Sequence, residues 1–233
     1  MKTIGLLGGM SWESSALYYR LLNEEVKHRL GGLHSARCVM LSVDFAEIER
    51  LQMAGEWERA GALLAEEARR IETAGAELLL LCTNTMHKLA PQIEESINIP
   101  FLHIADATGA AIRRAGLQTV GLLGTRFTME EDFYADRLRK RWNLEVLIPK
   151  PADRQIVHQI IYEELVLGIV REESRREYLL IIDDLRRRGA EGIIEGCTEI
   201  GMLVTPEHTD VPLFDTTRIH ATAAVESALS ERR

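Results

Sequence analysis

Short apolar runs alternate along the chain with longer stretches in which apolar residues recur at helical spacing. This alternation is typical of βα units arranged around a parallel sheet. The pattern predicts strands at 3–7, 39–43, 78–82, 100–104, 120–123, 146–148, 193–195 and 213–214. It predicts helices at 11–29, 57–74, 106–115, 130–141, 153–167, 173–188 and 217–230. Ser11 is a good N-cap for the first helix because its hydroxyl can accept a hydrogen bond from a main-chain N–H.

The chain also repeats itself imperfectly. Three segments occur twice, in the same order. TIGLLGG at 3–9 corresponds to TVGLLGT at 119–125, and GAE at 75–77 is repeated at 189–191. NIPF at 98–101 corresponds to DVPL at 210–213. We therefore predict an α/β fold of two pseudo-symmetric domains, each a parallel-sheet, Rossmann-like βα sandwich, with the active site in the cleft between them. The expected domains are 1–106 and 107–215, and a C-terminal helix at 216–233 could pack on the first.

Charge and composition narrow the class of protein. The net charge of −8 argues against a nucleic-acid partner, because such proteins need a basic surface. The chain lacks a run of about 18 apolar residues, so no membrane-spanning helix is expected. The apolar N-terminal run is broken by Gly5 and Gly8, which favours a strand and turn over a signal peptide. Three cysteines are too few for a disulfide framework, so we expect a cytoplasmic protein with free thiols.

Two pairs of strand ends could carry chemistry, because ligands of open α/β sheets bind outside the carboxyl ends of the strands. The first pair is 8–11 with 124–125, where glycines permit tight turns. Its spacing is not that of a dinucleotide-binding fingerprint. The second pair is 82–87 with 196–201, where hydroxyl, amide and thiol groups follow apolar strands. These groups suit a small carboxylate ligand.

Within the second pair, the Gly-Ala-Glu anchor places Thr83 opposite Cys197 and Cys82 opposite Gly196. Aligning the two Cys-Thr pairs would instead match Cys82 with Cys197. We prefer the anchor because it needs no gap within the strand. Cys197 could act as a proton-transfer base if its surroundings lower the thiol pKa, or it could be a buried, inert thiol. Cys38 is interpreted as a core residue.

The histidines allow several interpretations. His87 could be a general acid or base, or it could orient the turn after the strand, and we favour the second. His103 and His220 are interpreted as structural or surface residues. Cys82, His87 and Cys197 lack a recognised zinc-ligand spacing, so no metal is expected.

Taken together, the motifs resemble the aspartate/glutamate racemase family, most closely its bacterial broad-specificity amino-acid racemase branch. The motifs are GGMSWE at 8–13, NTxH at 84–87, IYEE at 161–164 and GCTE at 196–199. The resemblance implies two α/β domains, a homodimer and catalysis without pyridoxal phosphate, metal or another cofactor. Family members typically carry a cysteine on each side of the substrate α-carbon. This chain departs from that pattern because Thr83 stands at the first position.

The resemblance also implies which residues contact the substrate. The candidate substrate-binding residues are Met10, Gln52, Asn84, Thr85, Thr198 and Glu199, with Glu164 a weaker candidate. We therefore predict a racemase of aspartate, glutamate or a broader set of amino acids, in which Cys197 and Thr83 exchange the α-proton on opposite faces. A related decarboxylase or isomerase of small carboxylic acids, or a non-catalytic carboxylate-binding protein, remains an alternative.

Overall fold

The computed structural model describes residues 1–230, and these divide into two compact units. The first unit combines Met1–Ile104 with the segment that begins at His220, and the second is Ala105–Ile219. The boundaries of independently folding domains, placed at 106 and 215, stay a prediction. Part of the helix expected at 216–233 lies outside the described residues, since these end at 230.

The first unit is built on a parallel sheet with the strand order β2-β1-β3-β4. Its strands are β1 (Ile4–Gly8), β2 (Cys38–Ser42), β3 (Leu78–Leu81) and β4 (Phe101–Leu102). Its helices are α1 (Trp12–Leu30), α2 (Phe45–Met53), α3 (Trp57–Thr73), η1 (Thr85–Leu89) and α4 (Ala90–Ser96), together with the C-terminal part of α11 (Thr216–Leu229).

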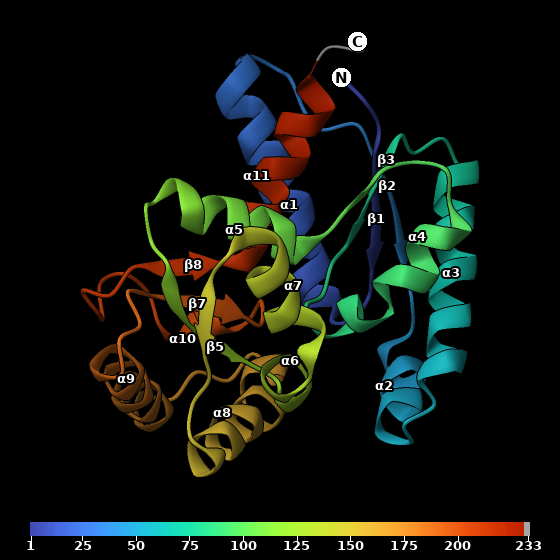
Figure 1. The fold of residues 1–233 in the computed structure, drawn as a ribbon. Coiled ribbons are helices and arrows are strands. Elements are labelled where there is room, and N and C mark those ends of the chain that lie inside the picture. Colours follow the sequence, from blue (N-terminus) through green and yellow to red (C-terminus); the bar gives the residue numbers. More distant parts are fainter. Residues whose placement is uncertain (231–233) are drawn as a thin grey trace. The chain divides into compact units, whose positions relative to one another are not determined.

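Alternation along the buried strands gives this sheet two apolar faces. Leu6 and Leu80 belong to one core cluster with residues of α1 and α11, whereas Leu7 and Leu81 belong to another with residues of α2, α3 and α4. The helices lie accordingly, with α1 and α11 on one face of the sheet and α3 and α4 on the other (Figure 1). The Ser11 hydroxyl accepts a hydrogen bond from the N–H of Ser14 at 3.3 Å, so the predicted N-cap is confirmed.

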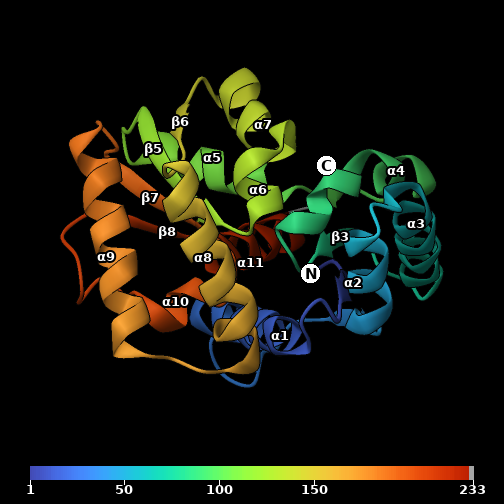
Figure 2. The same cartoon turned by 90° about the horizontal axis from the view of Figure 1, so that it is seen from below.

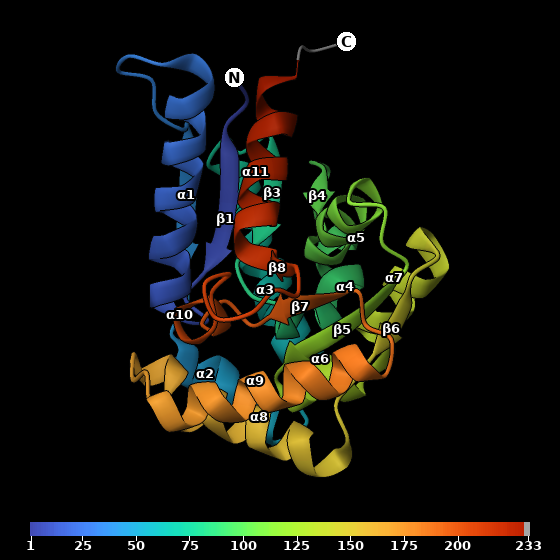
Figure 3. The same ribbon diagram turned by 90° about the vertical axis from the view of Figure 1, so that its left-hand side faces the viewer.

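The second unit repeats this plan with the strand order β6-β5-β7-β8. Its strands are β5 (Thr119–Gly124), β6 (Glu145–Leu147), β7 (Gly192–Gly196) and β8 (Leu213–Asp215). Its helices are α5 (Ile104–Arg114), α6 (Arg126–Glu130), α7 (Asp132–Trp142), α8 (Pro151–Glu163), η2 (Leu165–Leu167), α9 (Glu172–Arg187) and α10 (Ile200–Leu203). Helices α8 and α9 cover one face of the sheet, and α5 and α7 lie on the other (Figures 2 and 3). The predicted α/β fold class, with two parallel sheets, is confirmed.

The sequence repeat corresponds to repeated hydrogen bonds. Glu77 Oε2 accepts from the N–H of Thr3 at 2.9 Å, and Glu191 Oε2 accepts from the N–H of Thr119 at 2.8 Å. In the sheets, Gly5 pairs with Leu79 and Gly121 pairs with Ile193. Counting along the strands from these pairs matches Cys82 with Gly196 and Thr83 with Cys197. The sheet register therefore agrees with the anchor-based alignment.

The structure differs from the predicted elements in two respects. The helix expected at 153–167 ends at Glu163, because Glu164 leaves the helical region and Gly168 adopts a left-handed conformation. Short helices α2, α4, α6 and α10 were not predicted, since each spans nine residues or fewer and gives little periodic signal. Among residues 1–230, none of the helices combines the length and apolar character needed to cross a membrane.

Candidate active site

The turn after β1 is held by a serine cluster at the start of α1. Ser15 Oγ accepts from the N–H of Gly9 at 2.7 Å and donates to the carbonyl of Ser11 at 3.0 Å. Gly9 has a φ of +96°, and a Cβ there would lie 2.2 Å from the carbonyl oxygen of Val43. Ser14 Oγ donates to the carbonyl of Cys82 at 3.2 Å, which ties this turn to the end of β3. The two strand ends of the first unit therefore form one connected loop cluster.

Polar residues follow β3 at once, as the sequence predicts. Thr83, Asn84 and Thr85 are all buried, at 9%, 4% and 7% exposed. Cys82, immediately before them, is fully buried, and burial alone raises the pKa of its thiol far above the usual range. A fully buried thiol is out of reach of a ligand at the strand end, so Thr83, which lies beyond β3 and is 9% exposed, is the better candidate for chemistry.

The two remaining candidates of the first unit come from the turn after β1 and from α2. Met10 follows β1 and packs in the core cluster that contains Ile48 and Leu51 of α2. Gln52 is the next residue of α2 and is only 3% exposed. The structure therefore brings Met10 close to the segment that carries Gln52, although the side chain of Met10 belongs to the core.

Three histidines of the first unit, His87, His103 and His220, are buried. His87 lies in η1 and is 1% exposed, whereas His103 and His220 are 3% and 0% exposed. A surface position for His103 or His220 was therefore a wrong alternative. His220 lies on α11 beside Ala221, Ala224 and Val225, whose helical spacing makes an apolar stripe.

In the second unit, a thiol and a carboxylate meet at the end of β7. The Cys197 thiol donates to Glu199 Oε2 at 3.0 Å, and the Thr198 hydroxyl donates to the same oxygen at 2.5 Å. Burial and the Glu199 carboxylate raise the pKa of Cys197 well above its ordinary value. Main-chain hydrogen bonds from Glu199 and Thr198 act in the opposite direction and lower it. The free site therefore holds a protonated thiol next to a group that can accept its proton.

The weaker candidate, Glu164, is engaged by neighbouring side chains. Ser174 Oγ donates to Glu164 Oε2 at 2.6 Å, and Arg171 Nη1 lies 3.5 Å from Glu164 Oε1. The side chain of Glu164 is 12% exposed. Both carboxylate oxygens of Glu164 therefore have a partner within the second unit, and its role as a substrate contact stays a prediction.

Sequence reasoning missed Glu195, which lies on β7 two residues before Cys197. Glu195 is 5% exposed, and its Oε1 has no hydrogen-bond partner among the described residues. Burial, reinforced by Asp215 on the neighbouring strand, raises the pKa of this carboxyl to about 8. Position within an apolar strand (Gly-Ile-Ile-Glu-Gly) was the only sequence signal for its burial.

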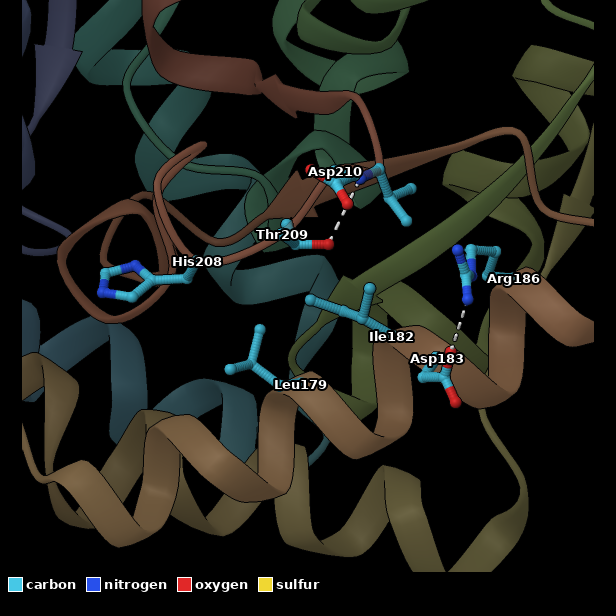
Figure 4. Close-up of a pocket in the computed structure, with 8 residues that line it drawn as sticks. Leu179, Ile182, Asp183, Arg186, His208, Thr209 and Asp210 are labelled. Carbon is cyan, nitrogen blue, oxygen red and sulfur yellow. Dashed lines mark hydrogen bonds and ion pairs between the residues drawn. The ribbon is translucent and has the colours of Figure 1, made fainter.

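One surface pocket of the second unit lies away from these residues. It has a volume of about 220 Å³ and lies between α9 and the segment before β8 (Figure 4). Arg186 pairs with Asp183 at 3.2 Å on its rim, and none of the predicted site residues lines it. Among residues 1–230, no group of three or more His, Cys, Asp or Glu side chains is placed to hold a metal ion.

The fold is that of an α/β protein with two parallel sheets and a thiol at a strand end, and comparisons with known proteins identify its family. The family model for Asp/Glu/Hydantoin racemase matches residues 7–224. The chain belongs to this family and is therefore an isomerase, which confirms the resemblance drawn from the motifs. Among curated proteins, the broad specificity amino-acid racemase RacX of Bacillus subtilis (strain 168) is 22% identical over 172 residues. That match covers 72% of this chain and 71% of RacX.

Two solved structures show the likeness over the full length. A Yersinia pestis protein assigned as an Asp/Glu racemase is 53% identical, with a TM-score of 0.93, and the match covers 99% of this chain and 100% of that one. An aspartate racemase homologue from Pyrococcus horikoshii OT3 is 32% identical, with a TM-score of 0.84 and the same coverage of 99% and 100%.

Proposed function

We propose that this protein is a cofactor-independent amino-acid racemase in which Cys197 and Thr83 exchange the α-proton on opposite faces of the substrate. The observation that carries the proposal is the 3.0 Å hydrogen bond from the Cys197 thiol to Glu199 Oε2. It joins a proton donor and a proton acceptor at a strand end, where α/β proteins bind ligands. Family membership supplies the reaction type.

The proton balance follows from this pair. The ammonium group of a bound amino acid brings a positive charge that favours the thiolate, and Glu199 accepts the thiol proton. The thiolate then removes the α-proton, and Thr83, or a water that it holds, delivers a different proton to the other face. Thr83 regains a proton from solvent, and Glu199 returns the former thiol proton to solvent, which closes the balance. Main-chain N–H groups near Thr83 and Cys197 would stabilise the charge that develops on the substrate carboxylate. The reverse reaction exchanges the two roles.

The two transfers are expected to be unequal, because a threonine hydroxyl is a far weaker acid than a thiol. The inequality affects the rate of isotope exchange from each enantiomer and leaves the equilibrium between enantiomers unchanged. The proposed substrate contacts are Met10, Gln52, Asn84, Thr85, Thr198 and Glu199. The proposed substrates are aspartate, glutamate or a broader set of amino acids, and the proposed form is a cytoplasmic homodimer.

The test is α-proton exchange in deuterated water, with single amino acids of both configurations, followed by proton NMR and chiral chromatography. We expect exchange and racemisation with at least one amino acid. Absence of exchange with every common amino acid would overturn the proposal. Release of carbon dioxide from malonate-type acids would instead indicate a decarboxylase. Binding of amino acids without exchange, unaffected by Cys197→Ser, would indicate a carboxylate-binding protein. Cys38→Ala is the matched control, because this thiol lies at the amino end of β2, away from the carboxyl ends of the strands.

A further inference from the structure

The side chain of His87 contacts the main chain of Thr83, and both nitrogens of its ring lie within hydrogen-bonding distance of main-chain groups. Nδ1 lies 2.7 Å from the carbonyl oxygen of Thr83, and Nε2 lies 3.2 Å from the main-chain nitrogen of Ile104. A carbonyl can only accept a hydrogen bond and a main-chain N–H can only donate one. Nδ1 therefore carries the proton and Nε2 accepts. The ring is neutral in this arrangement, because a second proton on Nε2 would point at the N–H of Ile104.

The ring has little freedom to leave this arrangement. It is 1% exposed and packs against the rings of His103 and Phe101, at centroid distances of 4.5 and 5.6 Å. The segment that holds Nε2 is itself fixed from the other side. The carbonyl of Leu102 accepts from Nε2 of His220 at 2.7 Å, which leaves Nδ1 of that ring to accept from the Tyr18 hydroxyl at 2.8 Å. The end of β4 is thus held by two histidines.

Thr83 is the first residue beyond the last ladder hydrogen bond of β3. That bond runs from the N–H of Cys82 to the carbonyl of Leu7 at 2.9 Å. Thr83 lies past it, and its carbonyl accepts from a side chain, His87, instead of from a neighbouring strand. The main-chain conformation at Thr83, and with it the direction of the hydroxyl, therefore depends on the His87 ring.

We propose that His87 is the positioning residue of the Thr83 half-reaction: its Nδ1–H holds the Thr83 carbonyl and so fixes the hydroxyl for proton delivery. This inference rests on the proposed racemase function. It assigns His87 no proton transfer of its own, since both ring nitrogens are occupied by main-chain groups. A displacement of a reacting group by about 1 Å can lower a rate by about 10²-fold. Loss of the hydrogen bond from His87 to the Thr83 carbonyl is therefore expected to slow proton delivery by Thr83.

Two substitutions separate the two ring nitrogens. In His87→Asn, the amide nitrogen lies the same number of bonds from the main chain as Nδ1, so it can still donate to Thr83. In His87→Gln, the amide group corresponds to Nε2 and the donor to Thr83 is lost. Thr83→Ala first identifies which enantiomer exchanges its α-proton through Thr83. For that enantiomer, we expect His87→Gln to lower deuterium exchange by about 10²-fold and His87→Asn to retain most of it. Exchange from the other enantiomer should persist in both variants.

A merely structural role would lower exchange from both enantiomers together, and that result would overturn the inference. Equal effects of His87→Asn and His87→Gln on deuterium exchange would overturn the inference as well. His34→Gln, an exposed histidine of the same unit, is the matched control and should behave as the wild type.

Nitrogen-15 NMR of the wild-type protein at pH 7, with labelled histidine, provides a test that needs no substitution. We expect His87 as the neutral tautomer protonated on Nδ1. An imidazolium or the other tautomer would overturn the inference alone, whereas absence of α-proton exchange in the wild type would overturn the proposed function.

Discussion

The buried carboxyl of Glu195 makes the stability of the protein depend on pH in a way that one substitution should remove. Its pKa is about 8 in the folded protein against an ordinary value of 4.5. Below pH 4.5 the carboxyl is protonated in both the folded and the unfolded state, so it adds no pH dependence. Between about pH 4.5 and 8, only the unfolded chain releases the proton, and the free energy of unfolding falls as pH rises. Above about pH 8 the loss is complete.

The magnitude follows from the width of that range. Each pH unit within it lowers the free energy of unfolding by about 1.4 kcal/mol. Between pH 5.5 and 7.5, the Glu195 carboxyl therefore contributes a fall of about 2.7 kcal/mol. Glu195→Gln keeps the shape of the side chain but cannot ionise, so the variant should lack this component. Its stability relative to the wild type should accordingly rise by about 2.7 kcal/mol over the same two pH units.

The assay is urea unfolding of both proteins at pH 5.5, 6.5 and 7.5, followed by far-ultraviolet circular dichroism. The quantity interpreted is the difference in free energy of unfolding between the variant and the wild type, and only its change with pH. Its absolute value also contains the cost of a buried amide with unsatisfied hydrogen-bonding groups, which is the same at every pH. Glu145→Gln, an exposed carboxyl on β6, is the matched control and should give a constant difference. A constant difference for Glu195→Gln, within about 0.5 kcal/mol, would refute the assignment of a buried, protonated carboxyl.

Three further substitutions probe the strand ends. Gly9→Ala should destabilise the protein by more than about 2 kcal/mol in urea unfolding, because the φ of Gly9 is +96° and a Cβ there would meet main-chain atoms. Gly31→Ala is the control, since Gly31 is also at positive φ but in open space, and it should lower the free energy of unfolding by about 1 kcal/mol. Glu199→Gln removes a charge that raises the Cys197 pKa, so iodoacetamide should alkylate that thiol at lower pH than in the wild type, while α-proton exchange slows; an unchanged alkylation profile would contradict this electrostatic role. Cys82→Ala should leave exchange unchanged, since this thiol is fully buried in the core of the first unit; loss of exchange would favour the alternative Cys-Thr alignment.

Much of the fold was predictable because its signals are local. The strands are short apolar runs, and α1 begins at a serine cap followed by an acidic first turn. The repeat predicted two sheets of one plan, and Glu77 and Glu191 make equivalent hydrogen bonds in both. Short helices such as α2 escaped prediction because nine residues contain too few turns to establish a period.

The environment of the candidate site residues was less predictable because it depends on contacts between distant segments. The Tyr18 hydroxyl meets His220 across 202 positions of sequence, and no local pattern indicates such a pair. Ser174 donates a hydrogen bond to Glu164 from ten positions further along the chain, and the motif at 161–164 gave no sign of this contact. The sequence identified Cys197 and Glu199 as neighbours, but only the side-chain geometry shows the thiol donating to the carboxylate.

The most direct test of the racemase proposal measures deuterium incorporation at the α-carbon of each enantiomer by the wild type, Cys197→Ser and Thr83→Ala. We predict exchange from both enantiomers in the wild type, at unequal rates. Cys197→Ser should abolish exchange from one enantiomer, and Thr83→Ala should mainly slow the other. Unaltered exchange in Cys197→Ser, or no exchange in the wild type with any amino acid, would contradict the account.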